Sequence, residues 1–389
     1  MARIIGVVTV ARSDYGHLVP ILERIRASSA LELQLFVGGS HLSDRFGRTV
    51  GAIETDGWSI TERIAGASEA DAPADVAGAA AVSLAGFARA FARRRPDLIL
   101  VLGDRIEMLS AAVAALPLTI PVAHVHGGEV TEGAIDEQAR HAITKLSHLH
   151  FPAAEPYARR ILQMGEEPWR VHCCGAPGLD RLTRVGTLSR EELARRIGLP
   201  LRRPTLLVTF HPVTLEVGAT AAHVDALAAA LETADGDVVI TYPGADALHG
   251  TVIRRLEALA GGRPGTRMVT GLGEDTYCSL LREADVMIGN SSSGLIEAPS
   301  FGLPVVNIGS RQRGRLRAAN VIDVGPAAEE IRAGLRRALE PAFRRSLAGM
   351  ANPYGDGRAA PRIVEVLERT ELGPRLTQKR FVDLDVPSR

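Results

Sequence analysis

The residues best suited to chemistry in this chain stand directly after short apolar runs. Asp104 follows the run LILVL (98–102) and leads straight into a helical pattern. Taken alone, it is well explained as a helix cap, because aspartate accepts hydrogen bonds from first-turn amides. The alternative is a functional carboxylate at the C-terminal end of a strand, where parallel sheets bind their ligands.

The next apolar run (121–125) ends in a denser group of reactive side chains. His124 and His126 share one face of the expected strand, and Gly127, Gly128 and Glu129 follow directly. A single histidine here would be structural in most proteins. Paired glycines let the backbone approach a ligand closely, so the whole group indicates a functional loop.

Asp136 opens the helix expected next, four residues before Arg140. Acids in a first turn and bases further along also suit the helix dipole, so a purely structural role stays open for both residues. His141, His148 and His150 lack the spacing of a zinc site and have no cysteine nearby. We expect no catalytic metal.

The second half of the chain carries residues suited to binding an anion. His211 follows the run TLLVTF (205–210) and precedes a proline, which holds it stiffly. The run 290–294, Asn-Ser-Ser-Ser-Gly, opens a helix toward Glu297. Small hydroxyls and free amides at a helix N-terminus form an anion site, and four candidates exceed what one cap needs. The arginines that follow the next strand and could neutralise a diphosphate are Arg311, Arg313 and Arg315.

A nicotinamide cofactor is not expected. The segment 271–276 imitates a dinucleotide fingerprint but has Thr276 where the third glycine belongs. The first strand of the chain leads instead into ARSDYG (11–16). We therefore expect no cofactor of any kind.

Short apolar runs alternate with helical patterns from end to end, which is typical of a parallel α/β protein. The expected strands are 4–10, 31–37, 98–102, 121–125, 171–174, 205–210, 237–242, 285–289 and 304–309. The expected helices are 17–28, 74–95, 106–116, 136–148, 155–164, 219–233, 274–283, 326–338 and 359–370. Several strands carry no polar residue on either face, as in a sheet covered by helices on both sides.

A domain boundary is expected near residues 178–204, where a polar stretch leads through a short helix to a proline-bearing linker. We place a first Rossmann-like domain at 1–185, a second at 186–372 and a loosely ordered tail at 373–389. The last helix can pack back on the first domain.

The composition restricts the partners of the protein. Acids and bases cancel at 45 each, so the surplus positive charge needed for nucleic acid or an anionic membrane is missing. We find no segment with the pattern of a membrane span, and expect none. Three cysteines, Cys173, Cys174 and Cys278, fit the small buried thiols of a reduced cytoplasmic protein.

Several long motifs, in one order, resemble those of the hydrolysing UDP-N-acetylglucosamine 2-epimerases of sialic- and legionaminic-acid pathways. They are ARSDYG, GSHLS, GDRIEM, HVHGGEVTEGAIDEQARHAITKLSHLHF, QMGEEP, FHPVT, GNSSSGLIEAPSFGLPVVNIGSRQRGR and NVIDV, between about residues 4 and 325. The resemblance implies two Rossmann-like domains in a GT-B-type arrangement, with a sugar nucleotide in the cleft between them. It also implies a homodimer or homotetramer that binds a UDP-sugar.

The resemblance further implies the residues of the site. Asp104 and Asp136 match catalytic carboxylates, and His211 matches a catalytic or phosphate-facing histidine. Residues that match contacts to the phosphates, the ribose or the sugar are Arg12, His41, Ser291, Ser292, Gly294, Glu297 and Arg311.

The chain departs from the family pattern at two places. Many members read HIEGG where this chain has HVHGG, so His126 replaces a catalytic glutamate and Glu129 is the nearest substitute for the second proton transfer. Other members, some linked to legionaminic acid, share the histidine form. The family motif PN-x-D appears as residues 243–246, Pro-Gly-Ala-Asp, without its asparagine.

The resemblance predicts inversion at C2 of a UDP-linked amino sugar. This carbon has no neighbouring carbonyl, so the expected route is elimination, in which a carboxylate takes the C2 proton while UDP leaves C1. Reprotonation of the 2-acetamidoglucal and addition of water give N-acetylmannosamine and UDP, whereas return of UDP would give UDP-N-acetylmannosamine. The expected reaction is the hydrolysis, with UDP-N-acetylglucosamine as the substrate; the alternatives are the non-hydrolysing reaction and the same chemistry on a UDP-2,4-diacetamido-2,4,6-trideoxy sugar. The competing interpretations are a GT-B glycosyltransferase and a sugar-nucleotide sensor without activity.

Overall fold

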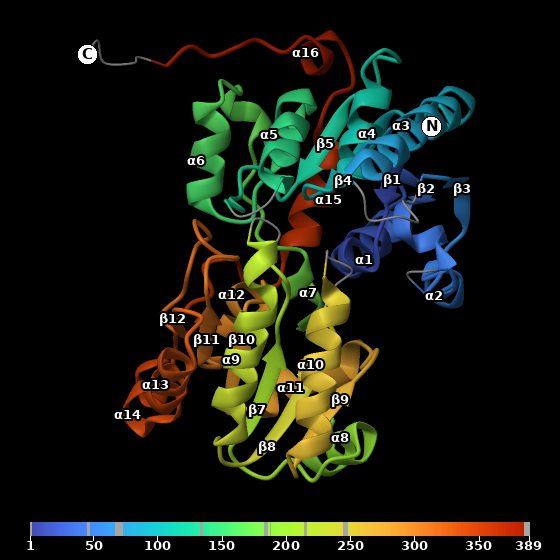
Figure 1. Ribbon diagram of the computed structural model, residues 1–389. Helices are drawn as coiled ribbons and strands as arrows, with labels where there is room; N and C mark the ends of the chain where they lie inside the picture. The colour runs from blue at the N-terminus through green and yellow to red at the C-terminus, as the bar shows by residue number, and fades with distance from the viewer. Residues whose placement is uncertain are drawn as a thin grey trace. The chain divides into compact units, whose positions relative to one another are not determined.

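The computed structural model describes residues 2–44, 47–66, 73–132, 135–182, 186, 188–213, 216–243 and 248–384. The chain divides into two α/β units, each built on a six-stranded parallel sheet (Figure 1). The first unit comprises residues 1–129, 135–181 and 354–389, and the second comprises 130–134 and 182–353. The predicted class of two Rossmann-like domains is confirmed.

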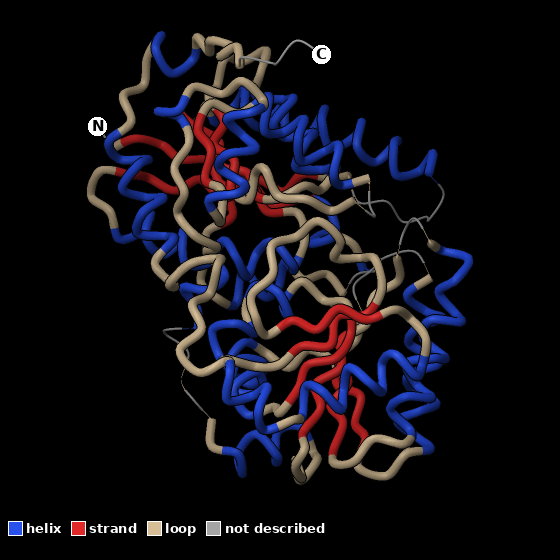
Figure 2. Tube along the Cα trace, turned by 90° about the vertical axis from the view of Figure 1, so that its left-hand side faces the viewer, coloured by secondary structure: helices blue, strands red, loops and turns tan. Residues whose placement is uncertain are grey.

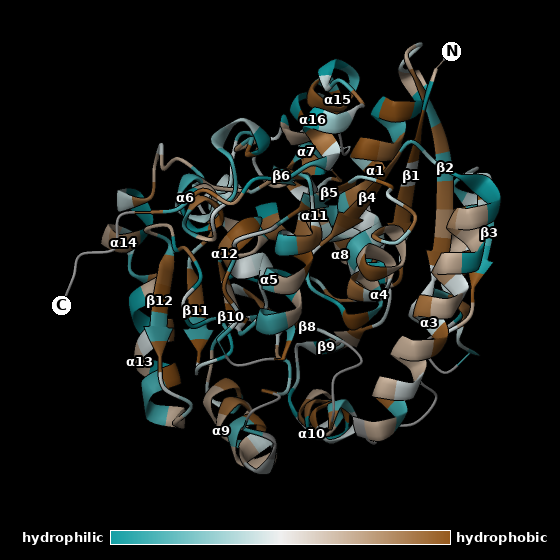
Figure 3. Cartoon of the chain, turned by 90° about the horizontal axis from the view of Figure 1, so that it is seen from above, coloured by the Kyte–Doolittle hydropathy of each residue, from teal (hydrophilic) through white to brown (hydrophobic). Residues whose placement is uncertain are grey.

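The first sheet has the strand order β3-β2-β1-β4-β5-β6. Its strands are β1 (Arg3–Thr9), β2 (Leu31–Gly38), β3 (Ile60–Ile64), β4 (Leu98–Leu102), β5 (Val122–Val125) and β6 (Leu149–Phe151). β1, β2 and β4 consist mostly of apolar residues, drawn brown in Figure 3. The strand order reverses between β1 and β4, so the loops after these two strands form the topological switch point, where such sheets bind ligands.

Helices cover both faces of the first sheet, as the apolar strands require. They are α1 (Arg12–Ala27), α2 (Val50–Thr55), α3 (Pro73–Arg94), α4 (Ile106–Ala115), α5 (Asp136–Leu146), α6 (Glu155–Gln163), α7 (Gly178–Leu182), α15 (Ala359–Arg369) and α16 (Pro374–Thr377). Leu18 of α1 and Ile363 of α15 pack with Val7 on one face. Phe91 of α3 and Met108 of α4 pack on the other face. In Figure 2 the strands are drawn red and the helices beside them blue.

The last part of the chain belongs to the first unit. The buried Asp180 carboxylate accepts hydrogen bonds from the amides of Ala359 at 2.8 Å and Ala360 at 2.7 Å, at the start of α15. The segment after Gly373 is also held, because the buried Arg170 donates to the carbonyl of Leu376 at 2.8 Å.

The second sheet has the strand order β12-β11-β10-β7-β8-β9, which is the order of the first sheet repeated. Its strands are β7 (Thr205–Thr209), β8 (Asp237–Thr241), β9 (Thr266–Val269), β10 (Val286–Gly289), β11 (Val305–Ile308) and β12 (Val321–Val324). Its helices are α8 (Arg190–Ile197), α9 (Thr220–Glu232), α10 (His249–Gly262), α11 (Glu274–Glu283), α12 (Ser293–Ile296), α13 (Ala328–Leu339) and α14 (Pro341–Ser346). The switch point lies between β7 and β10, at the loops that carry His211 and the serine run.

Some expectations from the sequence were wrong. The run 171–174 is not a strand: only Val171 forms an isolated bridge, to His150 in β6, and β6 is the strand that closes this edge of the sheet. Cys173 is exposed, whereas Cys174 and Cys278 are buried as expected. By length and composition, one helix in the described part of the chain, α3, could cross a membrane. Its Phe87 and Phe91 are nevertheless buried in the core of the first unit.

Candidate functional site

Asp104 lies at the switch point of the first sheet, immediately after β4. The amide of Gly103 donates to Val125 O at 2.9 Å, so the pairing of β4 with β5 continues up to the residue before Asp104. α4 begins at Ile106 with Arg105 as its N-cap, and within the described segment 103–115 no side chain caps it. Asp104 therefore does not cap α4, although the sequence allowed that role.

The carboxylate of Asp104 instead accepts a hydrogen bond from Arg140 of α5. Arg140 is 1% exposed, and its second terminal nitrogen donates to Glu137 Oε2 at 3.2 Å. A buried guanidinium that bonds two carboxylates fixes the direction of each. Asp136, the other predicted carboxylate, is the first residue of α5 and is partly buried.

His124 ties the loop after β4 to α5. Its Nε2 lies 2.7 Å from Gly103 O, and its Nδ1 lies 3.1 Å from Thr144 Oγ1. Burial lowers the pKa of His124 to about 3, so the ring is neutral, with Nε2–H donating to the carbonyl and Nδ1 accepting from the hydroxyl. His124 thus positions the backbone that carries Asp104.

His126 and Glu129 meet in a turn after β5. The imidazole Nδ1 of His126 lies 2.5 Å from Glu129 Oε1, and the two side chains are 9% and 4% exposed. The sequence offered Glu129 as an independent acid. The geometry makes it the partner of His126.

The predicted substrate contacts of the first unit are Arg12 and His41, in the loops after β1 and β2. Arg12 is exposed and is the first residue of α1. His41 lies in the short helix η1 (Gly39–Leu42) and is fully buried. Its Nε2 is 2.9 Å from Thr9 Oγ1 and its Nδ1 is 2.7 Å from Thr49 Oγ1. His41 therefore supports the loops through protein hydroxyls.

His211, at the switch point of the second sheet, is anchored through its backbone. Its amide donates to Asn290 Oδ1 at 2.7 Å, and Asn290 Nδ2 donates back to His211 O at 2.8 Å, which joins the ends of β7 and β10. Burial, with the Arg311 guanidinium nearby, lowers the pKa of His211 to about 3. At neutral pH the ring can donate a hydrogen bond to a phosphate but adds no charge.

The serine run forms the turn between β10 and α12, as predicted. Ser291 Oγ accepts from the amide of Ser293 at 3.3 Å, and Ser291 and Ser292 remain partly exposed. Gly294 is buried, and a Cβ there would lie 2.8 Å from Val305 Cγ1, so its role in the structure is close packing on β11. Glu297 follows α12 and is partly buried.

The three arginines after β11 have different surroundings. Arg311 is partly buried and its Nη1 lies 3.3 Å from Asn290 O, beside the serine turn. Arg313 is exposed. Arg315 donates to Val130 O at 3.2 Å, in the short segment 130–134 that belongs to the second unit. Arg311 is therefore the best placed of the three to bind an anion at the serine turn.

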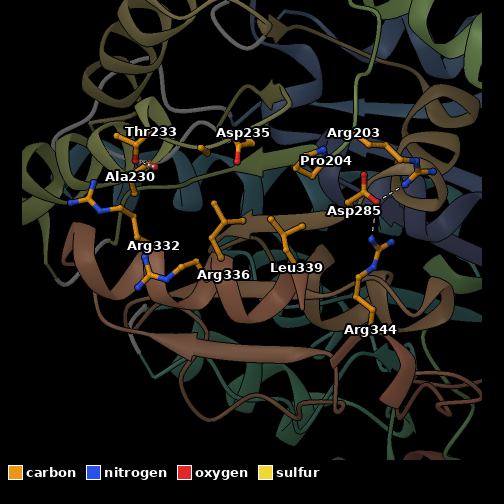
Figure 4. Close-up of a pocket in the computed structure, with 12 residues that line it drawn as sticks. Arg203, Pro204, Ala230, Thr233, Asp235, Asp285, Arg332, Arg336, Leu339 and Arg344 are labelled. Carbon is orange, nitrogen blue, oxygen red and sulfur yellow. Dashed lines mark hydrogen bonds and ion pairs between the residues drawn. The ribbon is translucent and has the colours of Figure 1, made fainter. Parts of the chain in front are cut away.

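A cavity of about 660 Å³ lies at the opposite end of the second sheet, where β7, β8 and β10 begin (Figure 4). Its Asp285 carboxylate accepts from the amide of Thr205 at 2.8 Å and pairs with Arg203 and Arg344. These arginines are thus occupied by an acid of the cavity itself. Doubly wound sheets bind their ligands at the other ends of the strands, so this cavity is not our candidate site.

Residues 244–246 of the altered Pro-Gly-Ala-Asp motif lie outside the described residues. Among those described, no group of three or more His, Cys, Asp or Glu side chains has the arrangement of a metal site.

Several residues of the site were not predicted. Asp14 Oδ2 accepts from the amide of Val10 at 2.9 Å and so shapes the loop after β1. The ring of His17 stands edge-on to that of His126, with centroids 5.8 Å apart. Tyr277 donates to Ser293 Oγ at 2.7 Å, and burial raises the pKa of this phenol. The motif ARSDYG pointed to the loop of Asp14, but no sequence signal pointed to Tyr277.

Three comparisons place the chain among known proteins. Residues 23–368 match the family model described as UDP-N-acetylglucosamine 2-epimerase. The chain is 38% identical over 388 residues to the UDP-N,N'-diacetylbacillosamine 2-epimerase (hydrolyzing) of Legionella pneumophila, covering 97% of this chain and 99% of that protein. It is 31% identical over 392 residues to the UDP-N-acetylglucosamine 2-epimerase of Neisseria meningitidis, covering 99% of this chain and 100% of that protein. A solved structure of UDP-GlcNAc 2-epimerase from Neisseria meningitidis bound to UDP-GlcNAc has the same fold, with a TM-score of 0.80 at 18% identity over 95% of this chain and 100% of that one.

Proposed function

Because the chain belongs to the UDP-N-acetylglucosamine 2-epimerase family, as its motifs predicted, we propose that it is a hydrolysing UDP-sugar 2-epimerase whose substrate is UDP-N,N'-diacetylbacillosamine. The products would be UDP and the free sugar inverted at C2. The choice of sugar rests on similarity, since the relative named for this substrate is 38% identical and the one named for UDP-N-acetylglucosamine is 31% identical.

The observation that carries the chemistry is the arrangement of acid–base groups on neighbouring strands. Leu102 of β4 pairs with Val125 of β5, so Asp104 and His126 each follow the end of one of two adjacent parallel strands. Inversion at a carbon without a neighbouring carbonyl needs one group to remove a proton and another to return it. These two side chains differ in type and in partners, which suits two different tasks.

In the proposed reaction Asp104 takes the C2 proton as the C1–O bond breaks and its electron pair leaves with UDP. The resulting C1=C2 bond is that of a glycal. Asp136, also in the first unit, assists Asp104 in the transfer of the C2 proton. The second unit binds the diphosphate through the serine turn, Arg311 and the N–H of neutral His211.

UDP-N-acetylglucosamine is the second candidate substrate, favoured by the relative of Neisseria meningitidis. The two sugars differ at C4 and C6, whereas the proposed chemistry takes place at C1 and C2. The proposed reaction is therefore the same for both, and only the sugar pocket decides between them.

The experiment is incubation of the protein with each UDP-sugar in D₂O, followed by ¹H and ³¹P NMR. We expect deuterium at C2 of the product and release of UDP, faster with the diacetamido sugar. A glycosyltransferase would leave C2 unlabelled, and a sensor would bind the nucleotide without turnover. Deuterium at C2 with UDP still attached to the sugar would identify a non-hydrolysing epimerase.

A further inference from the structure

The turn after β5 is built to bring Glu129 back onto His126. His126 has a φ of +63° and Gly128 a φ of +75°, so the chain reverses within three residues. A Cβ on Gly127 would lie 2.9 Å from His124 Nδ1, and a Cβ on Gly128 would lie 2.4 Å from Tyr157 O. Any larger residue would open this turn and separate the two ionisable side chains.

The contact between these side chains fixes how the imidazole is used. A carboxylate can only accept, so Nδ1 of His126, which lies 2.5 Å from Glu129 Oε1, carries the proton of this hydrogen bond. Among the described residues, none lies within hydrogen-bonding distance of Nε2. Nε2 is therefore the nitrogen that can exchange a proton with a ligand.

The other ionisable groups around His126 come from four elements. His17 of α1 is neutral, because burial lowers its pKa to about 3, and His124 of β5 is neutral for the same reason. Arg181 of α7 lies beside His17, and Arg160 of α6 donates to Gly128 O. Amid these groups, Glu129 is the carboxylate that contacts Nδ1 of His126.

We propose that His126 and Glu129 form a dyad in which His126 Nε2 returns the proton to C2, while Glu129 is a positioning residue that holds the ring. The inference rests on the proposed function. The imidazolium gives its proton to C2 of the glycal, the π electrons form the new C–H bond, and water adds at C1. The added water loses its proton to solvent, and one proton passes through solvent from Asp104 to His126 to restore both groups.

The test compares three variants by the products they release from the UDP-sugar in D₂O. His126→Gln retains a polar group near Nε2 but cannot carry the proton, so we expect at least a hundredfold less epimer. Elimination by Asp104 should continue, so UDP and the free glycal should accumulate instead. A purely structural role of His126 would reduce both products together.

Glu129→Gln keeps a hydrogen-bond acceptor but removes the charge that stabilises the imidazolium. We expect kcat to fall 10- to 100-fold and the basic limb of the pH profile to move down by about one unit. Glu129→Asp, which keeps the charge, should recover part of the rate and restore the limb. An unchanged profile in Glu129→Gln would overturn the dyad.

The chain offers a matched control in another buried histidine–glutamate pair. His150 Nε2 lies 2.9 Å from Glu166 Oε2, and both side chains are fully buried in the first unit, at β6 and after α6. Glu166→Gln should lower the melting temperature but leave the pH profile and the product ratio unchanged. A shift of the limb in this control as large as that in Glu129→Gln would also overturn the proposal.

The wild-type reaction distinguishes a failure of the proposed function from a failure of the dyad. If the wild type neither releases UDP nor labels C2 with either sugar, the proposed function fails. If the wild type is active and His126→Gln yields normal amounts of epimer, the dyad alone fails.

Discussion

Arg140 binds Asp104 across 36 positions of sequence, and it does so from a site that is 1% exposed. A further hydrogen bond of Arg140, to Glu137 Oε2 at 3.2 Å, also holds the guanidinium in place. The proposed base is therefore oriented by a helix that is separate from the strand that carries it. Two predictions follow from this arrangement, one for the arginine and one for the aspartate.

Arg140→Met should impair both stability and catalysis. It leaves two carboxylates near each other without their shared cation, and removing one partner of a buried ion pair costs about 3–5 kcal/mol. We expect a lower urea midpoint and at least a tenfold lower kcat for the protein that still folds. Arg94→Met is the control, because Arg94 pairs with Glu62 at the surface with its own side chain 51% exposed, and should cost at most about 1 kcal/mol.

Asp104→Asn should lower kcat at least a hundredfold, because the amide cannot accept the C2 proton. The amide retains an oxygen for Arg140, so the fold and the affinity for UDP should change little. Titration calorimetry with UDP and rate measurements on the same preparation check both statements. Asp136→Asn is expected to behave in the same way, and near-wild-type turnover in either variant removes that carboxylate from the mechanism.

The central strands could be predicted because they are buried on both faces. β4 (LILVL) and β7 (TLLVT) are buried at every position; β4 is a continuous apolar run, and β7 is apolar at its three central positions. The strands at or near the edges, such as β3 (ITERI) and β9 (TRMV), keep exposed or partly exposed positions, so no apolar run marks them. The very short β6 was missed for its length, and the apolar run at 171–174 was taken as a strand in its place.

The site could be predicted in part, for a related reason. Ligands of parallel sheets bind at the carboxyl ends of the strands, so the sequence could predict that the loops with Asp104 and His211 each lie at the binding edge of a sheet. The hydrogen-bond partners of these residues could not be predicted, because they come from segments that are distant in the sequence. Helical spacing related Arg140 to Asp136, but no spacing rule pointed to the hydrogen bond of Arg140 with Asp104, 36 positions away. His17 and Tyr277 likewise carry no motif of their own.

The double variant Ser291→Ala, Ser292→Ala should weaken the binding of UDP about tenfold or more. Both residues are partly exposed in the turn that leads into α12, and their hydroxyls are proposed to bind the diphosphate. We expect a higher KM for the UDP-sugar with kcat nearly unchanged. Ser189→Ala is a control in the same unit, because this serine caps α8 and should affect stability alone. Equal UDP affinity in the double variant and the control would contradict the assignment.

His124 should contribute to the pH dependence of the free energy of unfolding. Burial lowers its pKa in the folded protein from 6.5 to about 3. Between these values the unfolded chain binds the proton and the folded protein does not, so stability falls as the pH decreases through this window. At pH 5 this effect lowers the free energy of unfolding by about 2 kcal/mol. In His124→Gln the loss of stability between pH 7.5 and 5 should be smaller by about this amount, although the variant is less stable at pH 7.5. Equal slopes of the urea midpoint against pH would show that His124 is protonated in the folded protein.

Asp180→Ala should destabilise the packing of α15, near the end of the chain, in the first unit. The Asp180 carboxylate is 1% exposed and accepts both amides that open α15, from Ala359 and Ala360. Its removal leaves two buried amides without their acceptor, which costs about 2–3 kcal/mol. Asp356→Ala is the matched control, because Asp356 forms an exposed ion pair with Arg362 and should cost at most about 1 kcal/mol. Urea titrations of both variants should show the larger shift for Asp180. Equal shifts would mean that α15 is held by its apolar face, through Ile363 and Leu367, rather than by this carboxylate.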